Sequence, residues 1–245
     1  MVWHVYKSVV IGAIITLLSV PSVRTLEAQE PALVIGGVVE LKPGQAYSFR
    51  LGRVMCCTYL DPIDDPRIRY VVEPSGFGEI DATSGELRVN ADAPHGVALR
   101  VQAEIPGQPT VAEATVMIYD PVMAPYVGLW REIARMPCGD VEGEIQSIPN
   151  PIEEFRIRVD GRFSLTWSAF ETYWDYWGEY RFAGASRRIT LSVDGGNRIP
   201  SALEFHGEMW VEDSTRLILS GPWLGVGMED SGGLDVCGHV FWRPL

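Results

Sequence analysis

Glu154-Phe-Arg-Ile-Arg-Val-Asp-Gly-Arg-Phe-Ser-Leu-Thr-Trp167 is the stretch that decides the fold of this chain. Apolar residues alternate with polar ones on both sides of Asp160-Gly161, at Phe155, Ile157, Val159, Phe163, Leu165 and Trp167. A period of two predicts strands with one buried face, and Asp-Gly is a strong signal for a two-residue hairpin turn. We therefore expect an antiparallel hairpin here.

The same alternation continues through the second half of the chain, for example at Ile189, Leu191 and Val193. Between Val127 and Trp242 the pattern predicts about eight antiparallel strands joined by short turns. A meander of this length either closes into a barrel or leaves two edges to protect. We expect an up-and-down β-barrel over residues 126–245.

The first half differs in composition, with no tryptophan from Gln29 to Ala124 and seven after that point. Seven short strands are predicted there, which suits an immunoglobulin-like β-sandwich: 32–35, 38–41, 46–51, 67–72, 85–89, 98–104 and 112–118. The segment 121–125 contains two prolines and is predicted to be a stiff linker. The chain is thus expected to be all-β, with separately folding domains over 29–120 and 126–245.

The first 28 residues have the features of a signal peptide. Lys7 precedes an apolar run from Ser8 to Val20, which Pro21 ends and which is too short to span a bilayer stably. Cleavage after Ala28 would leave an exported protein, periplasmic, cell-surface or secreted, with no membrane insertion; an uncleaved anchor is the alternative. The net charge of −12 argues against nucleic acid and anionic membranes as partners.

Export makes the four cysteines interpretable as disulfide partners. In an even-numbered up-and-down barrel, the first and last strands are antiparallel, so paired residues keep a constant index sum. Trp130 with Arg243 gives 373, and Cys138 with Cys237 gives 375, a slip that a bulge or the Met136-Pro137 break could absorb. A Cys138–Cys237 disulfide is predicted. For the adjacent Cys56 and Cys57, a vicinal disulfide is favoured over free thiols or pairing with another chain.

Two family resemblances follow from these residues. The stretches 78–89, 96–103 and 112–118 resemble bacterial immunoglobulin-like domains, with an Ile-Asp…Ser-Gly turn and a Val-x-Ala strand. Gly128-Leu-Trp130 and Phe241-Trp-Arg243 resemble the lipocalin-like (calycin) barrels, in which a basic side chain packs over the tryptophan near barrel closure. The first resemblance implies a spacer or adhesive module over about 31–120, and the second a lipocalin-like barrel over 126–245.

No catalytic motif, cofactor fingerprint or metal-ligand spacing is present, so an enzyme is not predicted. Glu204, His206 and Glu208 alternate along one strand and could join His239 in a metal or acid–base site. Their neighbours occupy the apolar face, so we interpret the three as the solvated face of a barrel strand.

The aromatic cluster provides the functional hypothesis. Five side chains are predicted to face inward and to bind a small apolar or aromatic ligand: Trp167, Trp174, Tyr176, Tyr180 and Phe182. Asp175 and Glu179 alternate with them and are expected on the outward face. The predicted function is non-enzymatic ligand binding in the barrel, with the sandwich as spacer or docking module. The alternative is a structural or adhesive envelope protein that binds glycan or protein, with a dry, fully packed barrel.

Overall fold

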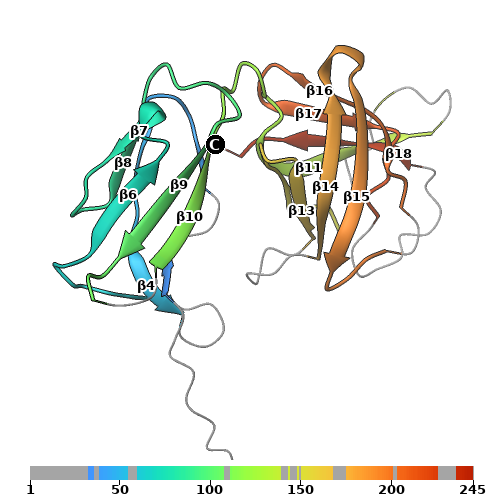
Figure 1. The fold of residues 1–245 in the computed structure, drawn as a ribbon. Helices are drawn as coiled ribbons and strands as arrows, with labels where there is room; N and C mark the ends of the chain where they lie inside the picture. The colour runs from blue at the N-terminus through green and yellow to red at the C-terminus, as the bar shows by residue number, and fades with distance from the viewer. Residues whose placement is uncertain are drawn as a thin grey trace, which may run out of the picture. The chain divides into compact units, whose positions relative to one another are not determined.

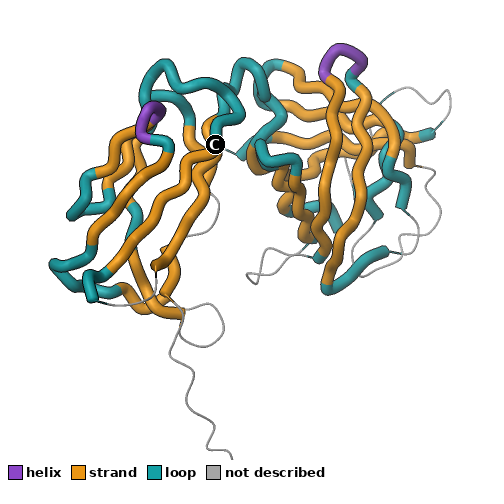
Figure 2. Tube along the Cα trace, in the orientation of Figure 1, coloured by secondary structure: helices purple, strands orange, loops and turns teal. Residues whose placement is uncertain are grey.

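The structure is a computed structural model that describes residues 33–35, 39–54, 60–107, 111–138, 143, 148, 150–167, 175–200, 203–225 and 236–244. Most of these residues form β-strands, and the described helices are two 3₁₀ turns, η2 (Ser75–Phe77) and η3 (Gly184–Ser186) (Figure 2). The predicted all-β class is confirmed. In the part of the chain that the structure describes, no helix has the length and apolar character needed to cross a membrane.

The described strands before residue 120 form three separate β-sheets. A four-stranded sheet has the order β2 (Val39–Leu41), β10 (Val111–Ile118), β9 (Ala98–Glu104) and β6 (Arg69–Glu73), and its β2–β10 pair is parallel. Two three-stranded antiparallel sheets have the orders β1 (Leu33–Ile35), β4 (Leu51–Val54), β5 (Leu60–Pro62) and β3 (Ala46–Ser48), β8 (Glu86–Val89), β7 (Gly78–Ile80).

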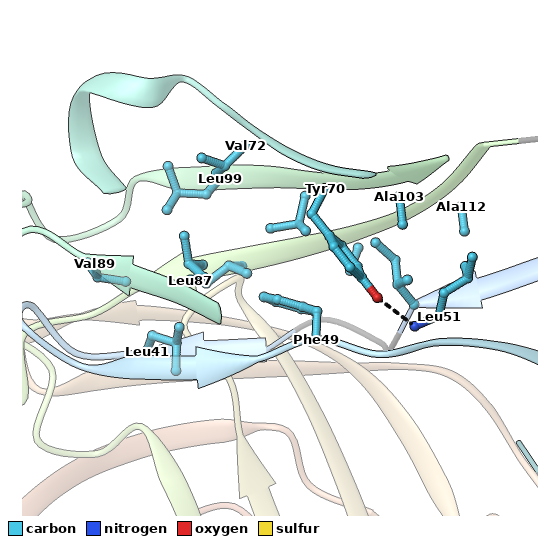
Figure 3. Close-up of a cluster of buried hydrophobic side chains, with 14 of the residues drawn as sticks. Leu41, Phe49, Leu51, Tyr70, Val72, Leu87, Val89, Leu99, Ala103 and Ala112 are labelled. Carbon is cyan, nitrogen blue, oxygen red and sulfur yellow. Dashed lines mark hydrogen bonds between the residues drawn. The ribbon is translucent and has the colours of Figure 1, made fainter. Parts of the chain in front are cut away.

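Alternate residues of these strands form one apolar core. Leu99, Val101 and Ala103 of β9 are completely buried, as the period of two requires. Within this core the Tyr70 hydroxyl accepts a hydrogen bond of 3.1 Å from the Leu51 amide (Figure 3). Because β6 and β4 belong to different sheets, this bond joins the sheets and satisfies the buried hydroxyl.

The single strand predicted over 46–51 is wrong. Residues 46–48 form β3 and pair with β8, whereas β4 starts at Leu51 and pairs with β1 and β5. Phe49 and Leu51 are both buried, so the apolar alternation continues through the point where the chain changes sheets. The three-residue strands β5 and β7, which the sequence did not predict, are too short to show a periodicity.

The strands after residue 127 close into an eight-stranded antiparallel barrel, which confirms that prediction (Figure 1). In chain order they are β11 (Gly128–Pro137), β12 (Glu154–Ile157), β13 (Arg162–Thr166), β14 (Tyr176–Ala183), β15 (Arg188–Gly196), β16 (His206–Glu212), β17 (Arg216–Ser220) and β18 (Val236–Trp242). Each strand pairs with its neighbours in sequence, and β11 pairs with β18.

The up-and-down order places alternate connections at the same end of the barrel. The short connections 158–161, 184–187 and 213–215 lie at what we call the short-loop end. The β12–β13 hairpin is one of them: Gly161 has φ +82°, which glycine adopts without strain, and the Arg158 amide donates to the Arg162 carbonyl at 2.9 Å. At the opposite, long-loop end, successive strands are joined across nine to sixteen residues, as between β11 and β12 and between β17 and β18.

A disulfide fastens the seam between β11 and β18. Cys138 and Cys237 are bonded, with their Cα atoms 4.9 Å apart, which confirms the predicted pair. The strand register runs from Arg131–Trp242, an index sum of 373, to Arg135–His239, a sum of 374. The shift comes from a bulge between Glu132 and Ala134, with a second irregularity at Met136/Pro137. Cys56 and Cys57 lie outside the described residues.

Arg243 covers the short-loop end of the barrel at Trp130. Its guanidinium carbon lies 4.3 Å from the centroid of the Trp130 ring, a favourable cation–π distance. The same guanidinium donates to the carbonyls of Pro125 and Val127 just before β11. These contacts join the first and last strands at the end opposite the disulfide.

Candidate functional site

The interior of the barrel is filled by aromatic side chains. Five of them are each 2% exposed or less: Trp130, Phe155, Phe163, Tyr176 and Phe241. Neighbouring rings contact one another, with centroids 5.2 Å apart for Phe155–Phe241 and 6.1 Å apart for Phe163–Tyr176. Contacts of this kind fill many small barrels. A candidate site therefore has to lie toward an end of the barrel.

The aromatic residues predicted to bind a ligand separate into two groups. Trp167 and Tyr176 lie at the long-loop end, with ring centroids 5.8 Å apart. Tyr180 and Phe182 both contact Tyr126, and the Tyr180 hydroxyl donates to the carbonyl of Arg158 in the short-loop hairpin at 2.6 Å. Six residues of strand span about 20 Å, so Tyr176 and Phe182 share a face but not a site. Trp174 lies outside the described residues.

Among the described members of the predicted set, only the Trp167 indole has an unsatisfied polar atom. Its side chain is 9% exposed, and its Nε1 is buried without a hydrogen-bond partner among the described residues. By contrast, the Tyr176 hydroxyl donates to the Leu224 carbonyl at 2.7 Å. Trp167 therefore presents a free donor beside an apolar ring at the long-loop end.

Asp175 holds the backbone of residues 165–167, which carries the Trp167 indole. One carboxylate oxygen accepts from the Trp167 amide at 2.7 Å and from the Thr166 hydroxyl at 3.2 Å. The Asp175 amide donates to the Leu165 carbonyl at 2.9 Å. Asp175, expected on the outward face together with Glu179, is 5% exposed because these donors replace water, whereas Glu179 is exposed.

A second polar feature of the long-loop end is an ion pair that faces into the barrel. In a regular strand, Glu132 and Arg135 would lie on opposite faces because they are three residues apart. The bulge at Ile133 adds one residue, so both side chains turn inward. Glu132 is paired with Phe241 and Arg135 with His239 across the seam. The index sums indicate a slip somewhere in this seam, but the alternation does not show where the bulge lies, so this pairing of Glu132 with Arg135 was not predicted.

The buried ion pair is fully hydrogen-bonded. The Arg135 guanidinium donates to both Glu132 carboxylate oxygens, at 3.0 and 3.2 Å, and to the Asn150 carbonyl at 3.2 Å. The Ile152 amide donates to Glu132 at 2.8 Å, and His239 Nδ1 lies 2.6 Å from the same carboxylate. Glu132, Arg135 and His239 have side chains at most 2% exposed. The network thus ties the segment 150–152 to the barrel wall.

The hydrogen bonds also define the tautomer of His239. Its Nε2 accepts from the Leu224 amide at 3.1 Å, so the ring proton sits on Nδ1 and is donated to Glu132. Trp223 stacks on this imidazole with centroids 5.1 Å apart, and the Arg135 guanidinium lies 5.6 Å from the Trp223 ring. Both imidazole nitrogens are occupied by groups of the protein, so neither is free to act on a substrate.

Because of this network, the free energy of unfolding should fall at acid pH. Burial raises the pKa of the Glu132 carboxyl, but His239 and Arg135 lower it further, to about 2 from an ordinary 4.5. The ionised Glu132 carboxylate contributes about 3 kcal/mol to the free energy of unfolding. This contribution is complete above pH 4.5 and is lost as pH falls toward 2. Urea unfolding at a series of pH values measures this loss. Glu132→Gln should lack it, and an equal loss in that variant would contradict the assignment.

The two histidines considered as an acid–base pair have different surroundings. His206 is exposed and pairs with Glu204 at 3.1 Å, whereas His239 is completely buried. Glu204, which precedes β16, and His206 and Glu208 on β16 are all exposed, as expected of a solvated face. Within the described residues, no three His, Cys, Asp or Glu side chains gather as metal ligands.

Comparison with known proteins assigns this chain to no family. No protein-family model matches the sequence, and the search of curated proteins finds no match. Two crystal forms of human protocadherin-24 EC1-2 match the structure at 14% and 11% identity. Each match covers 67% of this chain and 89% or 88% of the other, with TM-scores of 0.27 and 0.25. The description of this chain as an all-β protein with a closed eight-stranded barrel rests on its strand pairing.

Proposed function

We propose that this is an exported, non-enzymatic binding protein that takes a small, largely apolar ligand at the long-loop end of its barrel. The observation that carries the proposal is the buried, unpartnered Nε1 of Trp167. In this proposal residues 126–245 are a lipocalin-like domain. Residues 31–120 are a bacterial immunoglobulin-like domain that serves as spacer or docking module.

An unpaired buried donor is destabilising by about 1–3 kcal/mol, and native proteins contain few of them. An acceptor atom on a ligand would remove this penalty at Trp167. The adjoining ring of Tyr176 would supply apolar contact, since its own hydroxyl is already bonded to Leu224. The ligand class that fits is therefore an apolar or aromatic body with one hydrogen-bond acceptor. A contribution from Trp174 stays a prediction.

A second candidate function is favoured by the filled middle of the barrel. The five interior rings are each 2% exposed or less, and Phe155, Phe163, Tyr176 and Phe241 contact one another in sequence. A barrel packed in this way suits a structural or adhesive envelope protein that binds glycan or another protein on its surface. The two candidates differ in whether the long-loop end binds a small molecule.

Trp167→Phe tests the proposal because it removes the indole N–H and keeps an aromatic ring. The probe is prodan, a neutral fluorescent naphthalene with a ketone oxygen as acceptor. We expect saturable binding by the intact protein and a dissociation constant about tenfold higher in the variant, the loss of about 1.4 kcal/mol that one hydrogen bond supplies. The smaller ring buries less surface, and removal of the unpaired donor should offset part of the stability lost with it.

Trp210→Phe is the matched control. Trp210 lies on β16 outside the core of the barrel, and its Nε1 donates to Glu212 at 3.1 Å. This variant should bind prodan as the intact protein does. Absence of saturable binding in the intact protein would reject the ligand-binding proposal and leave the packed barrel as the function to pursue.

A further inference from the structure

Residues 221–225, which we call the plug, enter the barrel from the long-loop end. The Leu224 side chain is completely buried in the same apolar cluster as Trp167 and Tyr176. Its carbonyl accepts from the Tyr176 hydroxyl at 2.7 Å, and its amide donates to His239 Nε2 at 3.1 Å. The backbone of Leu224 is thus held by one side chain from β14 and one from β18.

The remaining bonds of the plug lie between backbone groups. The Gly221 amide donates to the Cys237 carbonyl at 2.7 Å, and Trp223 and Glu204 exchange two backbone bonds of 2.9 and 3.0 Å. These bonds do not change with pH. The bond from Leu224 to His239 does, because an imidazole accepts at Nε2 only while that nitrogen carries no proton.

We propose that His239 is a pH switch that releases Leu224 from the barrel and opens the ligand site on acidification. This inference rests on the proposed function, because the site it opens is that of Trp167 and Tyr176. A proton taken from solvent at Nε2 would make His239 a donor at both nitrogens. The Leu224 amide would then face another N–H instead of an acceptor and would have to leave.

The charged groups around the His239 imidazole affect the equilibrium between its neutral and protonated forms. Glu132, on β11, holds Nδ1 and favours the protonated ring, whereas Arg135 on the same strand opposes a second positive charge. Tyr176 on β14 stays neutral because burial raises its pKa well above the usual 10. Trp223 presents an uncharged ring, and the Glu204 carboxylate beside the plug is paired with exposed His206. The geometry therefore couples one proton to one hydrogen bond.

The test is amide hydrogen exchange at Leu224 in the full chain, followed by NMR between pH 7.5 and 5.5. Because opening takes up one proton, the protection factor of Leu224 should fall by up to about tenfold per pH unit on acidification. His239→Gln keeps an acceptor but no titratable proton, so its Leu224 protection should not depend on pH. His206→Gln is the matched control and should behave like the intact protein.

A direct ring titration keeps the proposal testable if His239→Gln does not fold. In the intact protein, the ¹⁵N resonance of His239 Nε2 should record protonation over the pH range in which Leu224 loses protection. Protection that is independent of pH, or lost while the ring stays neutral, would overturn the switch. Prodan separates the two proposals: loss of Leu224 protection without prodan binding at either pH would support the switch and reject the ligand site.

Discussion

Glu132→Gln lowers the free energy of unfolding by about 3–5 kcal/mol at pH 7, which is the usual effect of removing one partner of a buried ion pair. The substitution leaves the Arg135 guanidinium charged inside the barrel, where its side chain is 2% exposed. It also weakens the bonds to Ile152 and His239 that the carboxylate now makes. Urea denaturation measures the change.

Glu179→Gln is the control, because Glu179 is an acidic residue of a barrel strand with an exposed side chain. Its free energy of unfolding should change by less than about 0.5 kcal/mol. The double variant Glu132→Met/Arg135→Met removes both charges and should be more stable than Glu132→Gln alone. A single variant as stable as the control would show that the ion pair does not support the barrel.

Removal of the Cys138–Cys237 disulfide has an effect of similar size. The bond closes a loop with a sequence separation of 99 residues, and the chain-entropy argument assigns about 4–5 kcal/mol to a loop of that length. The bond also holds the ends of β11 and β18, whose register carries the Arg135–His239 pair. We expect Cys138→Ala/Cys237→Ala to unfold at correspondingly lower urea concentration.

A reducing agent provides the matched comparison. Added to the intact protein, it should cause a loss of stability close to that of the double variant. Added to the double variant, it reports on Cys56 and Cys57 alone. A double variant with the stability of the intact protein would contradict a role for this bond in closing the barrel.

The barrel could be predicted because the apolar alternation that indicates its strands is local and recurs along the chain. Alternation around Asp160-Gly161 indicated a hairpin, and the same period in later strands indicated a meander long enough to close. The disulfide followed from antiparallel geometry, since index sums near 373 bring Cys138 and Cys237 together. The pattern failed where the chain changes sheets between Ser48 and Leu51, because apolar alternation continues through the change.

The site was only partly predictable, for two physical reasons. Periodicity gives the face of a strand but not the height along it, so Tyr176 and Phe182 were grouped although they lie at opposite ends of the barrel. A bulge reverses the faces beyond it, so Glu132 and Arg135 carried no sign of being partners. The role of His239 depends on the Leu224 amide, which contacts it from a loop fifteen residues earlier in the chain.

The ¹⁵N–¹H spectrum of the tryptophan indoles tests the central claim most directly. The Trp167 Nε1–H resonance is identified by its absence from the spectrum of Trp167→Phe. On titration with prodan at pH 7.5, this resonance should move downfield and saturate, because a free donor gains an acceptor. The Trp210 resonance, whose N–H is already bonded to Glu212, should stay in place. A Trp167 resonance that does not move while prodan binds, or no binding at all, would contradict a ligand site at the long-loop end.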